Sequence, residues 1–199
     1  MIPVREQAEP ANFGVLVRAP GEAFLRTNRS PKRADFSRHD YWRRALPDMK
    51  SKYSSTCAYS AMPVIGDASI DHFLPKTIYP VQAYMWSNYR LCMASLNGKK
   101  GNDQTVLDPF SIQPNWFHLD LASLFVQPNP DAPRIVQPRI RRTIDVLGLN
   151  STTLITARFN IYAAYLRNGD LDFLTEFYPF IAVEVTRQAT PSPPTIPPS

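Results

Sequence analysis

Four polar residues near the middle of the chain, Asp71, His72, Asn88 and Asn97, are of the types that support metal-assisted hydrolysis. A neutral imidazole, whose ordinary pKa is about 6.5, can take a proton from water at neutral pH. A carboxylate and an amide oxygen are hard ligands that suit Mg²⁺ or Mn²⁺. Such an ion can stabilise the negative charge that develops on a phosphodiester when the activated water attacks it.

The sequence around these residues predicts a strand, a loop, a second strand and a short helix. Residues 70–74 alternate apolar and polar side chains before Pro75, and residues 89–94 form a second strand-like run. Ser95 is a candidate N-cap for a helix near residues 96–101. We therefore expect the four polar side chains to converge on one small site.

Residues 69–101 resemble the ββα-metal core, also called the His-Me finger, of the HNH endonuclease family. In that family an Asp-His pair ends the first strand, an Asn follows in the loop, and a His or Asn opens the helix. Asp71-His72, Asn88 and Asn97 take these places here, which makes an H-N-N variant. The residues that start with Asn97 are similar to the Asn-x-x-Lys ending common in the family. The nuclease domain of the RNA-guided CRISPR effector also has Asn at this last position.

The resemblance implies a role for each of these residues. His72 would be the general base, and Asn88 would hold its ring in orientation. Asp71 and Asn97 would bind one Mg²⁺ or Mn²⁺ ion. The phosphates of the nucleic acid would be neutralised by three nearby lysines, Lys76, Lys99 and Lys100.

Each residue taken singly also fits an ordinary structural role. A His at the end of a strand is usually a half-buried, hydrogen-bonded residue of the core. Asp71 could cap a turn, and Asn97 could cap the helix without contacting a metal. Lys99 and Lys100 could be solvated surface residues. The nuclease interpretation depends on all of these positions occurring together at the family spacing.

The two cysteines of the chain predict no structural zinc. Many HNH proteins hold the motif with a zinc ion bound by two Cys-x-x-Cys pairs, but each pair is reduced here to Cys-x-x-Ser, at Cys57 and at Cys92. A serine hydroxyl is a poor zinc ligand, and structural zinc sites use four nitrogen or sulfur donors. We expect Met93 and Leu96 to pack where the zinc would otherwise lie.

Positive charge is concentrated ahead of this motif. The chain has a net charge of +5 and an isoelectric point of about 9.3. Residues 26–52 alone contain nine Lys or Arg against three Asp, a net charge of +6. Aromatic residues are interleaved with these charges and could anchor the basic segment on the core. Such a segment fits a nucleic-acid partner, and a solvated helix face is the ordinary alternative.

We predict one mostly helical α+β domain. An irregular arm at residues 1–34 precedes the nuclease domain at 35–187, whose ββα core covers about 57–101. The Pro-rich tail at 188–199 is expected to be disordered. The other expected elements are a helix at 36–52 capped by Ser37, in which Pro47 marks a kink or the junction of two short helices, a strand at 59–65, a hairpin over 116–126, and helices at 139–147, at 151–166 and after Asp170.

The sequence suggests no membrane partner and a location in the cytoplasm. No apolar run approaches the roughly 20 residues that a spanning helix needs. The N-terminus lacks the charged-then-apolar order of a signal peptide. Two cysteines make no disulfide framework, which favours a reducing compartment.

The sequence therefore predicts a metal-dependent endonuclease that hydrolyses phosphodiester bonds of nucleic acid, with DNA as the expected substrate. Two alternatives stay open. One is a nucleic-acid-binding protein with a catalytically dead HNH fold. The other is a nuclease subunit of a defence or restriction system that is licensed by a protein partner such as an ATPase.

Overall fold

Helices predominate over strands in the computed structural model, which describes residues 1–64 and 66–189. The described strands form two small antiparallel sheets of two strands each, which confirms the α+β class. The strands are β1 (Ala68–His72), β2 (Tyr89–Met93), β3 (Phe117–Leu119) and β4 (Val126–Pro128). The helices are η1 (Gly14–Arg18), α1 (Ala19–Thr27), α2 (Arg33–Arg38), η2 (Tyr41–Ala45), α3 (Leu46–Lys52), η3 (Pro80–Gln82), η4 (Trp86–Asn88), α4 (Ala94–Lys100), α5 (Gln137–Leu147), α6 (Thr152–Asn168), α7 (Leu171–Phe177) and α8 (Pro179–Ala189).

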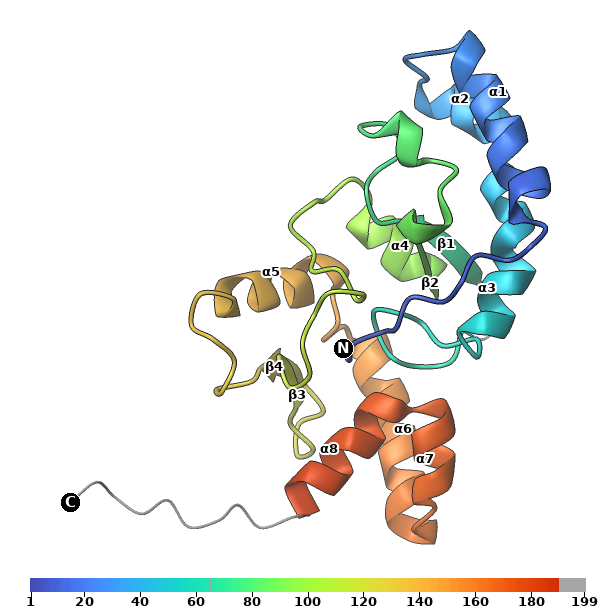
Figure 1. The fold of residues 1–199 in the computed structure, drawn as a ribbon. Helices are drawn as coiled ribbons and strands as arrows, with labels where there is room; N and C mark the ends of the chain where they lie inside the picture. The colour runs from blue at the N-terminus through green and yellow to red at the C-terminus, as the bar shows by residue number, and fades with distance from the viewer. Residues whose placement is uncertain (65, 190–199) are drawn as a thin grey trace.

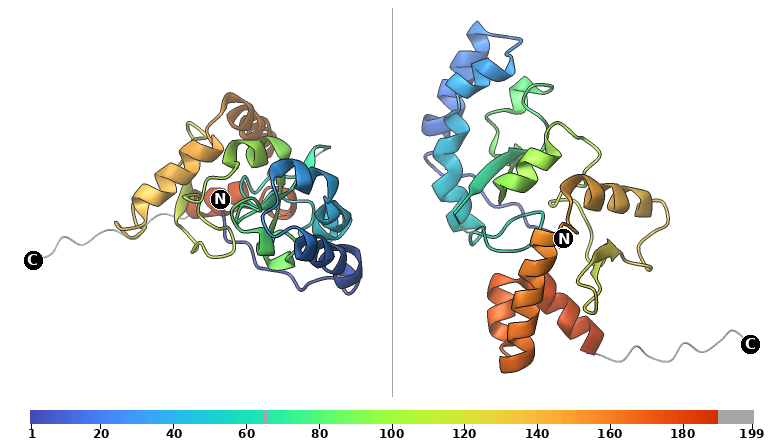
Figure 2. Two further views of the ribbon diagram at one scale, coloured as in Figure 1. Left: turned by 90° about the horizontal axis from the view of Figure 1, so that it is seen from above. Right: turned by 180° about the vertical axis from the view of Figure 1, so that it is seen from behind.

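The β1–β2 hairpin lies between two groups of helices. Helices α1 to α3 run along one side of the hairpin, and α6 to α8 gather at the other end of the molecule (Figure 1). The same separation is visible from behind (Figure 2). Within residues 1–64 and 66–189, no helix combines the length and the apolar character that crossing a bilayer requires.

The hairpin and helix α4 follow one another in the order that the sequence predicts. β1 pairs with β2 in antiparallel register, and the pairing ends with His72 opposite Tyr89. The strand stops two residues before the predicted end. One more ladder bond follows the pair of His72 and Tyr89, from the amide of Phe73 to the carbonyl of Asn88 (2.9 Å). The carbonyls of His72 and Phe73 accept from Lys100, at 3.1 Å each.

Helix α4 begins earlier than predicted. Its N-cap position is Met93, the last residue of β2, and no side chain caps it. Ser95 lies inside the helix, so it is not the N-cap. β2 passes into α4 without a loop. The amide of Ala94, the first residue of the helix, still donates to the carbonyl of Asp67 (3.1 Å), the residue before β1. The helix ends before Gly101, as predicted, and the φ of Gly101 is 51°.

Residues 14–27 are helical, in contrast to the irregular arm predicted for 1–34, whereas residues 1–10 form neither helix nor strand. η1 runs without a break into α1. α2, η2 and α3 confirm the helical interpretation of residues 36–52 and place Pro47 in the first turn of α3. Ser37 lies inside α2, whose N-cap position is Lys32, so the predicted cap was wrong.

The ring of Tyr84 is the main contact through which these N-terminal helices dock on the loop between β1 and β2. Phe24, Phe36 and Trp42 surround Tyr84 with ring centroids 6.4, 6.4 and 6.0 Å away. Gly21 of α1 lies against the same ring, and a Cβ at this position would be 2.1 Å from Tyr84 Cγ. The close approach requires glycine at this position. The buried residues Val17, Gly21 and Phe24 share one face of the helix, four and three residues apart.

The strand predicted at residues 59–65 does not form. The described residues of this segment make turns, with one isolated bridge between Thr56 and Pro63. Tyr59 is buried and donates its hydroxyl to Asp71 (2.6 Å), which holds the turn against the hairpin. Ile65 lies outside the described residues.

The C-terminal half follows the sequence prediction closely. β3 and β4 form a hairpin as expected, although β4 begins only at Val126, the last residue of the predicted second strand, 123–126. α5 ends at Gly148 with φ 59°, and Ser151 precedes α6. Asp170 caps α7 by accepting a hydrogen bond from the amide of Phe173 (2.9 Å). α8 extends two residues into the predicted tail, and the rest of that tail, 190–199, lies outside the described residues.

We expect Gly21→Ala to weaken the docking of the N-terminal helices. The added methyl would overlap the Tyr84 ring, which is held in place because its hydroxyl donates to the carbonyl of His39 (2.7 Å). Overpacking of this kind costs about 1–3 kcal/mol, so the melting temperature should fall by roughly 2–12 °C. Gly14→Ala is the matched control, because a Cβ at Gly14 meets nothing within 4 Å. Equal losses in the two variants would contradict this docking contact.

Candidate active site

Asp71 and His72 end β1 and face different neighbours, because successive side chains of a strand point to opposite faces. Asp71 contacts Lys100 of α4, and His72 contacts Ala83 of the loop 73–88. The second edge of β1 has no partner strand among the described residues. A site shared by both side chains must therefore lie at this end of β1 or along its free edge, where groups from both faces can meet.

The ring of His72 is held in one tautomer. Its Nε2 lies 2.9 Å from the carbonyl oxygen of Ala83, and because a carbonyl only accepts, Nε2 carries the proton. Nδ1 is left with a lone pair that can accept a proton. Trp42 and Tyr89 pack edge-on against the ring, with centroids 4.8 and 5.3 Å away. Burial, and after it the charge of Lys76, lowers the pKa of His72 to about 3, so the ring is neutral at neutral pH.

Asn88 does not bond the ring of His72, in contrast to the role implied by the resemblance. Its Oδ1 accepts from the amide of Leu74 (2.7 Å), and its Nδ2 donates to the carbonyls of Leu74 and Gln82 (3.0 Å each). Gln82 is the neighbour of Ala83, whose carbonyl holds His72. Asn88 therefore orients His72 indirectly, because it fixes the loop that supplies the Ala83 carbonyl.

Asp71 is buried in a hydrogen-bonded ion pair. Its Oδ1 lies 3.1 Å from Lys100 Nζ, and its Oδ2 accepts a hydrogen bond from Tyr59 (2.6 Å). Lys100 also donates to the carbonyls of His72 and Phe73, so all three ammonium hydrogens have acceptors. Burial raises the pKa of Asp71, while the charge of Lys100 and the hydrogen bond from Tyr59 act to lower it.

The three lysines predicted to contact phosphates have different surroundings. Lys100 is 1% exposed and bonded on all sides, so it does not face a substrate in this structure. The side chain of Lys99 lies against Gly148, at the end of α5. Lys76 is half-buried, lies 4.9 Å from the centre of the Trp42 ring, and lines a groove. Of the three, Lys76 alone lines the groove together with Asn97.

Asn97 lies in α4 with one half of its amide engaged. Its Nδ2 donates to Ser69 Oγ (2.7 Å) and to the carbonyl of Ile70 (3.2 Å), both on β1. No donor within residues 1–64 and 66–189 bonds its Oδ1, so this oxygen is free to take a ligand. The side chain caps no helix, because it is the fourth residue of α4.

A groove runs along the free edge of β1, between this edge and the helices α2 and η2. It consists of a cavity of about 520 Å³ and an adjoining one of about 420 Å³, both lined by Arg33, Lys76 and Asn97. Trp42 lines the larger cavity and packs edge-on against His72. The groove thus brings Asn97 together with two cations, and the Trp42 indole separates it from His72.

The resemblance names Asp71 and Asn97 as the residues that would hold a divalent cation, but the structure places only Asn97 in the lining of the groove and buries Asp71, which is 2% exposed. The two carboxylate oxygens keep lone pairs beyond those used by Lys100 and Tyr59, and Asn97 Oδ1 is unused. The described residues contain no group of three or more His, Cys, Asp or Glu that could hold a metal. An ion here would have few protein ligands, which suits Mg²⁺ because it keeps several waters. The ammonium of Lys100 would compete with it for Asp71.

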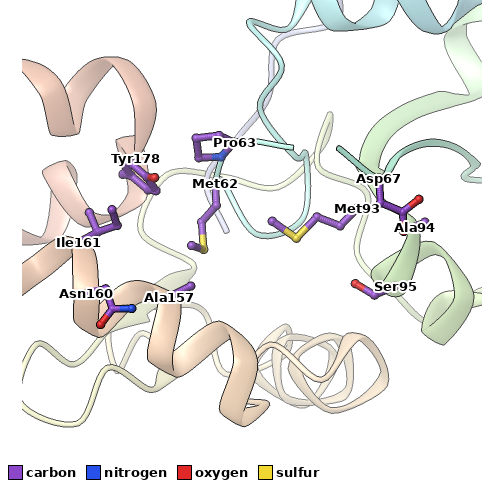
Figure 3. Close-up of a pocket in the computed structure, with 10 residues that line it drawn as sticks. All are labelled: Met62, Pro63, Asp67, Met93, Ala94, Ser95, Ala157, Asn160, Ile161 and Tyr178. Atoms are coloured by element: carbon purple, nitrogen blue, oxygen red, sulfur yellow. The ribbon is translucent and has the colours of Figure 1, made fainter. Parts of the chain in front are cut away.

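A separate cavity of about 420 Å³ lies between the hairpin and the C-terminal helices. Figure 3 shows Met62 and Met93 on one side of it, and Ile161 and Tyr178 on the other. Its lining is largely apolar, and Asp67 is its one acidic group. Hydrolysis needs groups that hold charge and transfer protons, so this cavity is a weaker candidate than the groove.

The two cysteines lie in the interior as free thiols. The amide of Ser60 contacts the sulfur of Cys57 at 3.5 Å. Burial raises the pKa of the Cys92 thiol, which disfavours the thiolate that zinc requires. Leu96 is buried as expected, while Met93 is half-buried. That the protein binds no structural zinc stays a prediction.

Several groups at this site were missed in the sequence. The hydroxyl of Tyr59 and the carbonyl of Ala83 carry no local pattern that would single them out. Arg33 belongs to the basic segment 26–52, which did signal a charged surface without indicating which residue faces the groove. Trp42 was read only as an anchor for that segment, and the structure adds its contact with His72.

We expect Lys100→Met to destabilise the fold strongly. It leaves Asp71 buried without its cation, and breaking a buried pair in this way costs about 3–5 kcal/mol. The additional change Asp71→Asn should recover part of the loss, because no charge is then left unpaired. Urea unfolding of the single and double variants measures both effects. Lys99→Met is the exposed control, and an equally mild effect of Lys100→Met would show that Lys100 is not buried as described.

The low pKa of His72 predicts a loss of stability in acid. Between pH 6.5 and 3 the unfolded chain binds a proton at His72 that the folded chain refuses, so stability is complete above about pH 6.5 and falls below it. At pH 5 this proton uptake lowers the free energy of unfolding by about 2 kcal/mol relative to its value at high pH. His72→Gln removes this term, so its free energy of unfolding should depend less on pH between 7 and 5 than that of the parent. Parallel curves for the two proteins would contradict the lowered pKa.

Comparison of the chain with protein-family models gave no match, and comparison with curated proteins gave none. The function of this protein is therefore inferred from its own residues and their geometry.

Proposed function

We propose that this chain is an HNH-type endonuclease that hydrolyses phosphodiester bonds of nucleic acid, with DNA as the expected substrate and Mg²⁺ or Mn²⁺ as the cofactor. The observation that carries the proposal is the state of His72. Its tautomer is set by the Ala83 carbonyl, its Nδ1 is free to accept a proton, and its ring is neutral. Asp71 lies next to it at the end of a strand that borders a basic groove.

Each residue of the site would have a distinct part in the reaction. When bound, the ion would stabilise the charge that develops on the phosphate, and Asp71 and Asn97 would hold it. His72 Nδ1 would take the proton of the attacking water. The carbonyl of Ala83 already accepts from Nε2, and it would stabilise the ring further once charged, because hydrogen bonds from a charged donor are stronger.

Substrate binding would also tune the base. The charge of Lys76 is, after burial, a cause of the low pKa of His72. A phosphate beside Lys76 would offset that charge and raise the pKa of His72 toward the range in which it accepts a proton readily. The same phosphate would lie close to Trp42, over whose ring Lys76 is placed, and Trp42 must move aside before water reaches the imidazole.

We propose a partner-licensed nuclease subunit as the second candidate. His72 is only 5% exposed, so the base is shut off from solvent in this structure. The C-terminal helices also expose large apolar side chains, with 58% of Phe159, 66% of Leu166 and 41% of Phe173 accessible. Exposed apolar groups of this size are typical of protein contact surfaces. A partner bound there, such as an ATPase, could release the site.

The test is cleavage of supercoiled plasmid with Mg²⁺ or Mn²⁺. We expect His72→Gln to lower the cleavage rate by roughly two to four orders of magnitude, because the general base is lost. DNA binding, measured in EDTA, should be retained. His118→Gln is the control, because His118 lies on β3 beside Glu184 and takes no part in the groove.

Cleavage by His72→Gln at the parental rate would overturn the catalytic assignment. Binding of DNA by the parent with no cleavage in either metal would favour the catalytically dead alternative. Cleavage that begins only when a partner protein is added would favour the licensed subunit.

A further inference from the structure

Two cations face the groove without a described carboxylate partner. Arg33 comes from the start of α2 and Lys76 from the loop that follows β1, and both line both cavities of the groove. Neither forms an ion pair with any residue in 1–64 or 66–189, and Lys76 contacts the face of Trp42 instead. By contrast Arg43, farther along the larger cavity, is neutralised by Asp40 (2.9 Å).

The two cations are close enough to repel one another. Burial is the main reason that the pKa of Lys76 is lowered, and the charge of Arg33 lowers it further. Asp71 is the one acidic group that acts in the opposite direction, and Lys100 already occupies its carboxylate. Like charges held together without a counter-ion are stabilised when an anion binds between them.

We propose that Arg33 and Lys76 form a subsite that binds one backbone phosphate of a nucleic acid, next to Asn97. One half of this subsite does not belong to the β1–β2–α4 motif, because Arg33 comes from α2. The planar fork of Arg33 suits a phosphate, and Lys76 adds a point charge. The inference rests on the proposed function only in naming nucleic acid as the source of the phosphate.

The lining of the groove also gives the direction in which the strand leaves the subsite. The larger cavity continues toward Asp67 and toward the ion pair of Asp40 with Arg43, so Asp67 is the carboxylate there that would repel further phosphates. The smaller cavity contains no acidic side chain and is lined by Thr77, Asn102 and the glycines of α4 and its end. The next phosphates are therefore expected along the smaller cavity, where amide and hydroxyl groups can donate to them.

The subsite exists because the N-terminal helices dock on the loop 73–88. Phe36, three residues after Arg33 on α2, is fully buried and packs near the ring of Tyr84. The start of α2 is fixed as well, since Asp35 Oδ2 accepts from the amide of Lys32 (2.8 Å). Arg33 is thus carried to the groove by a short, anchored helix.

The test measures binding of a fluorescein-labelled 20-base-pair duplex by anisotropy, in EDTA and over a range of KCl concentrations. Arg33→Gln and Lys76→Gln should each weaken binding about fivefold to tenfold and should reduce the slope of log K against log salt by about 0.9. The double variant should weaken binding by less than the product of the single effects, because both residues hold the same phosphate. Arg38→Gln is the matched control, since Arg38 is exposed on the same helix and does not line the groove.

Equal weakening by Arg33→Gln and Arg38→Gln would overturn the subsite, because it would indicate only diffuse attraction by the basic segment. Effects that multiply in the double variant would overturn the shared phosphate. Competition by poly-glutamate as strong as that by unlabelled duplex would overturn the assignment to nucleic acid. The plasmid assay is separate from these outcomes. If the parent protein binds DNA through Arg33 but never cleaves it, the subsite is supported and the endonuclease proposal is contradicted. If the parent cleaves DNA and Arg33→Gln changes neither binding nor cleavage, the endonuclease proposal is supported and the subsite is contradicted.

Discussion

The ammonium of Lys100 is the contact on which the rest of the site depends. It reaches from the last residue of α4 to the carboxylate of Asp71 and to the carbonyls at the end of β1. An ammonium buried this deeply is tolerated only because every hydrogen has an acceptor. The same contact packs α4 against the hairpin and holds the end of β1, where Asp71 and His72 lie. A lysine that resembles a substrate contact in the sequence is here the internal cation of the fold.

The loop 73–88 ties the proposed base to the N-terminal helices. Asn88 pins both ends of the loop, and the carbonyl of Ala83 sets the tautomer of His72. The next residue, Tyr84, is the ring on which α1 and α2 dock. The adjacent residues Ala83 and Tyr84 therefore link the proposed base to the helix that carries Arg33 to the groove. A change in the docking of α2 would be felt at His72 without any contact between the two.

Local signals account for what the sequence predicted, and non-local contacts account for what it did not. The order of strand, strand and helix follows from alternation and from a glycine stop, so β1, β2 and Gly101 were placed nearly correctly. α1 was missed because a glycine, Gly21, stands between Val17 and Phe24 on the face that it buries, which weakens the apolar pattern. The Ala83 carbonyl was invisible because any residue supplies one. The burial of Lys100 could not be predicted, since a lysine pair near a glycine is typical of a solvated surface.

The charge balance at the groove has a consequence for the proposed endonuclease. A divalent ion that approaches Asp71 meets the charges of Lys100, Lys76 and Arg33, and one carboxylate cannot offset all of them. A substrate phosphate supplies the missing negative charge and also neutralises the two groove cations. Ion and substrate should then each strengthen the binding of the other, because the coupling between two ligands is reciprocal. In such a site the metal would be held weakly until nucleic acid is present, so the ion and the phosphate would reach the base together.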